Sequence, residues 1–182
     1  MDQERDSRWP LLRKEIGRAR HALHLTDTDF LPLSSIEWRQ VEETVYSRFC
    51  KIKSTQRPIW LWNSLNTLFP VIKLSLDYWT EPMLIQLLRP TQRVFLYVNE
   101  AYRGQEKCWW YEGTTAAIQA VLQEVEGLDE WGVIDKKYNW LLCSTHHGDL
   151  VGSGEQIVGA IMKVAASQNL CARLRVIPAS QP

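Results

Sequence analysis

The sequence lacks an apolar N-terminal segment, a long apolar run and closely spaced cysteines. Its first ten residues, MDQERDSRWP, contain no apolar core of the kind that a secretory signal requires. The most apolar region, residues 58–79, is interrupted by polar residues and falls short of the roughly 18 uninterrupted apolar residues of a membrane span. The cysteines, at positions 50, 108, 143 and 171, form no C-x-x-C pair, a pattern typical of reduced thiols. We therefore predict a cytoplasmic protein without a membrane partner.

The sequence also lacks an excess of charge of either sign. It contains 21 Lys and Arg against 21 Asp and Glu, and without a concentrated basic surface we expect no general binding to nucleic acid. The charge is uneven, because residues 100–137 carry eight acidic and four basic side chains, including Glu124, Glu126, Asp129 and Glu130. This acidic run predicts a surface that attracts a basic protein partner. A solvated helix end would have the same composition.

Tryptophan is the unusual component, with nine residues in a chain of 182. Indole rings need large buried pockets, or else they lie exposed at an interaction surface. Trp109 and Trp110 are adjacent, so in a strand one faces the core and the other faces the opposite side of the sheet. Because Trp anchors many interfaces, we predict that Trp110 and the nearby Glu112 contribute to a partner-binding surface.

The first part of the chain, residues 1–56, is predicted to be mainly helical. Apolar residues at alternating spacings of three and four mark a first helix over 9–23. Ser34 and Glu37 then have the spacing of a capping box, and a second apolar stripe follows over 38–52. Two consecutive amphipathic helices suggest a helical hairpin that packs on another element.

The rest of the chain predicts a sheet with helices on it. Residues 57–92 are mixed, because 58–79 fit either a strand or a helix, and a short helix is predicted over 83–88. The pattern of residues 93–170 then predicts the element order β-β-α-β-β-α, and residues 171–182 are predicted to form a tail. The predicted strands are 94–98, 108–111, 131–134 and 138–143, and the predicted helices follow Thr114 or Thr115 and the capping pair Ser153 and Gln156. We predict a single α+β domain with a mainly antiparallel sheet.

The stretch YNWLLCSTHHGD, residues 138–149, combines a strand pattern with residues that ligate metals or transfer protons. Side chains alternate along an extended strand, so His146 and His147 are predicted to point to opposite faces. Cys143, His147 and Asp149 would share one face, and their ligand atoms suit zinc. No further ligand stands at a diagnostic spacing. We therefore expect a structural role for the segment, with no metal and no cofactor.

A hydrolase centred on the same segment is the alternative hypothesis. In that case Cys143 or Ser144 would be the nucleophile and a neighbouring histidine its base, or Cys143, His146, His147 and Asp149 would form a metal-dependent site. A nucleophile two or three residues from its base along a strand lacks the geometry to meet it. A buried structural role for Cys143 is therefore favoured.

Two weaker patterns also have structural explanations. Glu100 and Glu112 stand at the ends of paired strands and could form an acid–base pair, but carboxylates at strand ends are commonly solvated. Residues 152–154, Gly-Ser-Gly, precede a helix as a phosphate loop would, but no complete phosphate-binding motif is present. Loop closure and helix capping by Ser153 account for this segment.

Three motifs in the sequence resemble motifs of a family of small bacterial proteins. They are W-Y-E-G at 110–113, D-K-K-Y-x-W-L-L-C-x-x-H-H at 135–147 and G-x-G-E at 152–155. The resemblance covers about residues 94–160. Such proteins are similar to the cytosolic proteins found beside polymorphic toxins, many of which are immunity proteins that bind and block a toxin. The resemblance implies protein binding and provides no catalytic residues.

The leading hypothesis is therefore a non-enzymatic immunity protein that masks a basic toxin domain with an acidic, aromatic surface. The hydrolase hypothesis is the first alternative. A structural homodimer built by the two N-terminal helices is the second.

Overall fold

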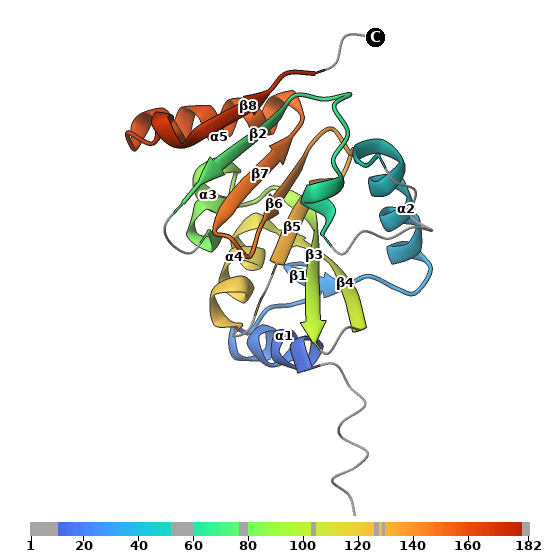
Figure 1. Cartoon of the computed structure of the whole chain (residues 1–182). Helices are drawn as coiled ribbons and strands as arrows, with labels where there is room; N and C mark the ends of the chain where they lie inside the picture. The colour runs from blue at the N-terminus through green and yellow to red at the C-terminus, as the bar shows by residue number, and fades with distance from the viewer. Residues whose placement is uncertain are drawn as a thin grey trace, which may run out of the picture.

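The computed structural model describes residues 11–51, 60–76, 80–102, 105–125, 128 and 130–179, with only the backbone described for 100–102 and 105–107 (Figure 1). Eight strands of this part form one sheet in the order β1-β4-β3-β5-β6-β7-β2-β8. Every neighbouring pair is antiparallel. The strands are β1 (Phe30–Pro32), β2 (Val71–Ser75), β3 (Arg93–Tyr102), β4 (Gln105–Thr114), β5 (Glu130–Asp135), β6 (Leu141–Ser144), β7 (Asp149–Ser153) and β8 (Leu174–Ile177). This confirms the predicted mixture of helices with an antiparallel sheet.

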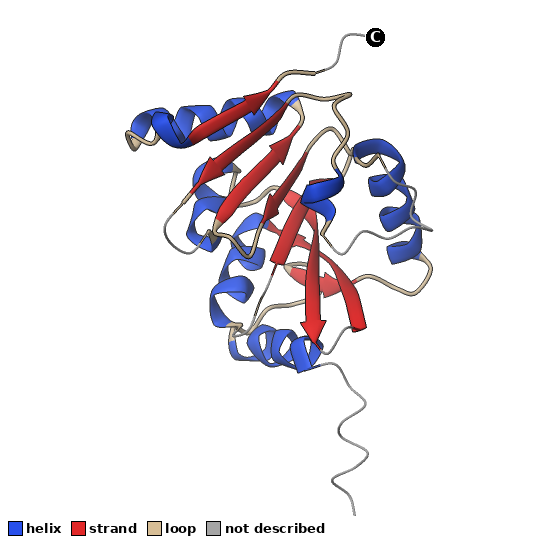
Figure 2. Ribbon diagram, viewed as in Figure 1, coloured by secondary structure: helices blue, strands red, loops and turns tan. Residues whose placement is uncertain are grey.

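Helices cover both faces of the sheet (Figure 2). The first face carries the larger apolar core, which includes buried residues of four helices: α1 (Leu11–Ala22), α3 (Leu84–Leu87), α4 (Thr115–Glu124) and α5 (Glu155–Ser167). The second face carries a separate core beneath α2 (Glu37–Phe49) and the 3-10 turn η3 (Leu61–Ser64). Two short 3-10 turns, η4 (Glu81–Met83) and η5 (Cys171–Arg173), complete the described elements. None of the described helices combines the length and apolarity needed to cross a membrane.

The two N-terminal helices do not form the predicted hairpin. The α1 stripe of Leu12, Ile16 and Ala19 belongs to the first core, whereas the α2 residues Val45 and Phe49 belong to the second. Strand β1 lies between the two helices in sequence and pairs with β4 at the sheet edge. The chain therefore passes from one face to the other, and each apolar stripe is buried against the sheet.

The β3–β4 hairpin confirms the predicted pair of strands and the opposite orientations of the tryptophans. Trp109 packs against the first core and Trp110 lies in the second, where it is 6% exposed. The prediction that Trp110 contributes to an exposed surface is therefore corrected. The second face is covered within the chain itself, by α2 and η3.

The predicted β-β-α-β-β-α unit, residues 93–170, contains one strand more than predicted, because residues 149–153 form β7. All five residues of β7 are buried, so no alternation of polar and apolar residues marked it as a strand. The preceding strand is also shorter than predicted. Tyr138 lies in a turn with φ 55°, its N–H donating to the Asp135 carbonyl at 2.8 Å, and β6 begins only at Leu141.

The ambiguous region, 58–79, and the predicted tail each contribute a strand near one edge of the sheet. Within 58–79 the chain forms η3 and then β2, which lies between β7 and β8. Within the predicted tail, residues 171–182, Leu174 to Ile177 pair with β2 as an edge strand. The tail is therefore part of the sheet as far as Ile177.

Two of the predicted helix caps are confirmed and one is wrong. The capping box before α2 is confirmed, since Ser34 N–H donates to Glu37 Oε2 at 3.0 Å and Glu37 N–H donates to Ser34 Oγ at 3.3 Å. Thr114 likewise caps α4. The predicted Ser153 cap is wrong, because Ser153 is a buried residue of β7 and Gly154 precedes α5.

Candidate functional site

The two adjacent histidines lie in a turn that follows β6. Thr145 organises this turn, because its Oγ1 accepts hydrogen bonds from the backbone N–H groups of His147 and Asp149, each at 3.2 Å. Gly148, with φ 73°, completes the turn by donating its N–H to the Thr145 carbonyl. The strand period therefore ends before the histidines.

The predicted divergence of the two imidazole rings is wrong. The ring centroids of His146 and His147 are 3.9 Å apart. A strand would have placed the two side chains on opposite faces, but β6 ends at Ser144 and the turn brings both rings together. Both histidines are exposed.

Two tryptophans complete a group of four rings, which we call the Trp–His cluster: Trp60, Trp62, His146 and His147. The His146 ring lies 5.0 Å from the Trp60 ring and 6.2 Å from the Trp62 ring. The His147 ring lies 6.0 Å from the Trp62 ring in an edge-on arrangement. Both tryptophans are partly buried, so the cluster has an apolar base and an accessible top.

A buried carboxylate holds the cluster from below. Glu130, the first residue of β5, is 1% exposed. Its Oε1 accepts a hydrogen bond from Trp62 Nε1 at 2.7 Å and lies 2.8 Å from His146 Nδ1. Its Oε2 is also buried and has no hydrogen-bond partner among the described residues. Oε1 therefore holds two rings in place, whereas Oε2 has no hydrogen-bond donor among the described residues.

The pKa of Glu130 is raised above its ordinary value of 4.5. Burial is the largest cause, and the hydrogen bonds of Trp62 and His146 oppose it only in part. A buried carboxylate oxygen without a donor favours the protonated form in the same direction. The position consequently tolerates a neutral side chain better than an ionised one.

We expect Glu130→Gln to make the protein more stable at pH 7.5, by about 1 kcal/mol in the free energy of unfolding. A raised folded-state pKa gives the wild type stability that is complete below pH 4.5 and lost as the pH rises through the folded value. The amide removes this dependence and can still accept from Trp62. Urea unfolding at pH 4.5 and 7.5 measures the difference, which should shrink at the lower pH. Glu43→Gln, at an exposed position of α2, is the control. A variant less stable at pH 7.5 would contradict the argument.

The predicted zinc ligands do not come together. Cys143 is fully buried in the second core, where it accepts a hydrogen bond from the Tyr97 hydroxyl at 3.3 Å. Burial raises the pKa of its thiol well above the ordinary range. Asp149 instead forms an ion pair with Lys73 at 2.6 Å. Among the described residues, no three His, Cys, Asp or Glu side chains are placed to hold a metal ion.

The side chains of the proposed nucleophiles, Cys143 and Ser144, form hydrogen bonds with residues other than a histidine. The Cys143 thiol is protonated and enclosed, and the buried Ser144 hydroxyl is hydrogen-bonded to Thr80. Of the residues in the hydrolase hypothesis, only His146 and His147 are neighbours at the surface. The carboxylate that contacts His146 is Glu130, from a different strand, whereas Asp149 forms its ion pair with Lys73.

The predicted acidic surface is only partly accessible. Glu124 is exposed at the end of α4, whereas Glu130 is buried under the Trp–His cluster. Glu126 and Asp129 lie outside the described residues. Glu112 forms ion pairs with Arg93 and Lys136, and these hydrogen bonds hold its pKa below the ordinary value even though burial opposes them. The prediction that Glu130 belongs to an acidic surface is therefore wrong.

The structure explains both of the weaker sequence patterns. Glu100 pairs with Lys107 and Glu112 with Phe95, so the backbone register places the two residues near different ends of the β3–β4 hairpin. Gly152 lies beneath α5, and a Cβ there would be 2.8 Å from Ile161 Cδ1. Its role is close packing of helix on strand, so residues 152–154 are not a phosphate loop.

Trp60, Trp62 and the role of Glu130 were missed by the sequence reasoning. The W-x-W spacing draws attention to the two indoles, but Trp62 lies in the 3-10 turn η3, so a strand pattern would not have placed them. The burial of Glu130 was not visible, because its partners stand 68 and 16 residues away in the chain.

Together, the fold and site define a class: an α+β protein with one antiparallel sheet and a surface cluster of Trp and His over a buried glutamate. A family model described as a family of unknown function (DUF6756) matches residues 8–165. The chain belongs to this family. No curated protein and no solved structure matches it.

Proposed function

We propose that this protein is a protein-binding module of the immunity type, which neutralises a bacterial toxin domain by covering it. The observation that carries the proposal is the Trp–His cluster, in which four rings lie together, both histidines exposed and both tryptophans partly buried. Trp is among the residues that contribute most to binding energy when an interface desolvates it. The toxin partner is suggested by the resemblance of the motifs at 110–113, 135–147 and 152–155.

The cluster is held in place before any partner arrives. Glu130 Oε1 bonds both Trp62 and His146, and the Trp60 ring lies 5.0 Å from His146. Side chains already fixed in one conformation lose less entropy on binding than mobile ones do. This fits a recognition surface, which gains affinity from rigid aromatic anchors.

The charge of the chain supports a basic partner. Residues 100–137 carry eight acidic and four basic side chains, and of these acids Glu124 is exposed near the end of α4. A negative surface increases the association rate of a positive partner and does so most strongly at low salt. A toxin with a basic active-site cleft, such as a nuclease, has the required charge.

The test uses the protein encoded by the neighbouring gene. We expect that gene to encode a toxin-like domain, the two purified proteins to form a stable complex, and co-expression to relieve the growth arrest that the toxin causes alone. A neighbour without toxic activity, or a toxin that the chain neither binds nor neutralises, would overturn the proposal.

Charge reversal tests the electrostatic part separately. Glu124→Lys should slow association severalfold at low salt and weaken its salt dependence, because long-range attraction acts on the encounter rate. Stopped-flow association at two salt concentrations measures the effect. Glu155→Lys makes the same charge change at the exposed start of α5, at the other end of β7 from the histidine turn, and should leave the rate nearly unchanged. Equal rates for all three proteins at low salt would reject steering by this acidic surface.

A second candidate function, a hydrolase, rests on the contact between Glu130 and His146. A buried carboxylate that bonds one imidazole nitrogen orients the ring and leaves the other nitrogen to act as a general base on water. Hydrolysis of activated esters and phosphate esters by the purified protein tests this function. We would expect His146→Ala to abolish turnover and Glu130→Gln to reduce it. No turnover above the uncatalysed rate would eliminate the candidate.

A further inference from the structure

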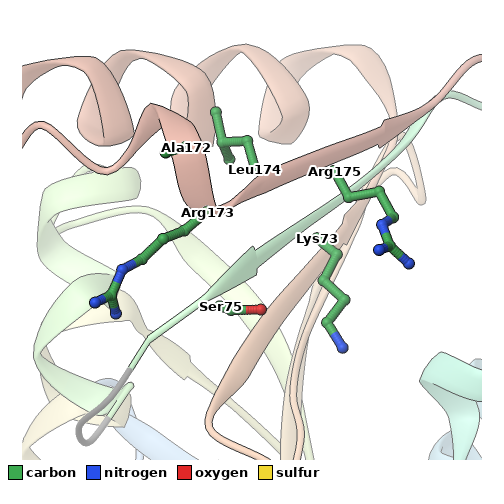
Figure 3. A pocket seen from close by; sticks show the side chains of 6 residues that line it. All are labelled: Lys73, Ser75, Ala172, Arg173, Leu174 and Arg175. Carbon is green, nitrogen blue, oxygen red and sulfur yellow. The ribbon is translucent and has the colours of Figure 1, made fainter.

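A cleft lies at the far edge of the sheet, between β2 and the chain that enters β8. It has a volume of about 290 Å³ and is lined by Lys73, Ser75, Ala172, Arg173, Leu174 and Arg175. Figure 3 shows Lys73 and Arg175 extending side by side from neighbouring strands, with Arg173 at the other end of the cleft. Three of the six lining residues are therefore cationic, in a protein whose net charge is zero.

The register of the strands places these charges on one side of the sheet. Lys73 is directly opposite Arg175 in the β2–β8 pair, and Ser75 is directly opposite Asp149 in the β2–β7 pair. Residues directly opposite in antiparallel strands share a face, and like charges in such a pair repel. Lys73 and Arg175 therefore place two positive charges on neighbouring strands, and an anion between them would be attracted to both.

One carboxylate forms an ion pair with the lysine of the cleft. Asp149 is 4% exposed and forms an ion pair with Lys73 at 2.6 Å. Burial opposes ionisation of Asp149, but hydrogen bonds from Lys73 and Ser75 outweigh it and lower the pKa. Asp149 therefore stays ionised and balances one positive charge. The two arginines are exposed, and no described carboxylate forms an ion pair with Arg175.

We propose that this cleft binds the phosphate group of a small phosphorylated ligand. The guanidinium group of Arg175 can donate two parallel hydrogen bonds to phosphate oxygens, and the Lys73 ammonium adds a point charge. The small volume suits a phosphate with a compact substituent. None of the residues that line the cleft belongs to the Trp–His cluster, and the proposal does not rest on the proposed toxin partner.

The test is a titration of the purified full-length protein with inorganic phosphate and with pyrophosphate at constant ionic strength. We expect saturable amide shifts in NMR spectra that are concentrated at residues 73–75 and 173–175. Arg175→Gln should weaken binding at least about tenfold, the loss expected when one charged hydrogen-bonding group is removed. Arg89→Gln removes an exposed arginine at the end of α3 and is the matched control.

Three results would overturn the proposal. The first is the absence of saturable shifts at the cleft at about 20 mM phosphate, a concentration at which even millimolar affinity gives nearly full occupancy. The second is equal weakening by Arg175→Gln and Arg89→Gln, which would indicate non-specific attraction. The third is saturation by a glutamate-rich peptide but by neither phosphate probe, which would assign the cleft to a protein contact.

Discussion

Replacing Trp62 with alanine should weaken binding of the proposed toxin partner by at least about thirtyfold, or roughly 2 kcal/mol. Trp62 contacts both histidines of the cluster and donates its indole N–H to Glu130. Alanine removes the ring, leaves His146 as the remaining hydrogen-bond partner of Glu130 Oε1, and frees the histidine rings to move. The loss should occur mainly in the dissociation rate, since contacts at the centre of an interface act after encounter. Calorimetry and surface-based kinetics measure both quantities.

The control for this variant is Trp109→Ala. Trp109 is also partly buried, but it packs against the first core, on the opposite face of the sheet. It should cost stability without changing the affinity of folded protein for the partner. Trp62→Phe adds an intermediate case, because it keeps a smaller aromatic ring and loses the hydrogen bond to Glu130. Full affinity in a folded Trp62→Ala protein would move the interface away from the Trp–His cluster.

Replacing Gly154 with alanine should lower the free energy of unfolding by about 3 kcal/mol or more. Gly154 has φ 109° and ψ 143°, a region that side chains with a Cβ rarely adopt. A Cβ there would lie 2.5 Å from the Asn139 carbonyl oxygen and 2.9 Å from Trp140 Cα. Trp140 is fully buried, so the main chain at that point cannot yield without disturbing the core. Urea unfolding followed by tryptophan fluorescence measures the loss.

Gly159→Ala is the matched control, since it makes the same chemical change five residues later. Gly159 lies inside α5, and nothing lies within 4 Å of the Cβ that it lacks. Alanine should stabilise the helix there by about 0.5–1 kcal/mol. If both variants shift stability in the same direction, the special conformation of Gly154 is not what limits substitution.

The elements predicted correctly from the sequence are those with strong local signals. The capping box of Ser34 and Glu37 and the apolar face of α4 each depend on residues within a few positions of one another. The β3–β4 hairpin is marked by two apolar runs that a polar loop joins. Such patterns are fixed by backbone geometry, so the structure reproduces them.

The parts that were missed depend on contacts between distant residues. No local pattern reveals that α1 and α2 pack on opposite faces, because each has an ordinary apolar stripe. Strand β7 is buried on both sides, which removes the alternation that identifies a strand. Glu130 was assigned to the surface because it is acidic. Its burial follows from Trp62 and His146, which only the fold brings to it.

The position of β2 has a consequence for the order of assembly during synthesis. Val71 pairs with Ser153 on one side and with Ile177 on the other, so β2 leaves the ribosome long before either flanking strand exists. Pairing over such sequence separations is slow, because a long loop must close before the contacts form. Until then, the nascent chain exposes a short apolar strand with both of its edges open. A chaperone that binds extended apolar segments would find its target at residues 71–75.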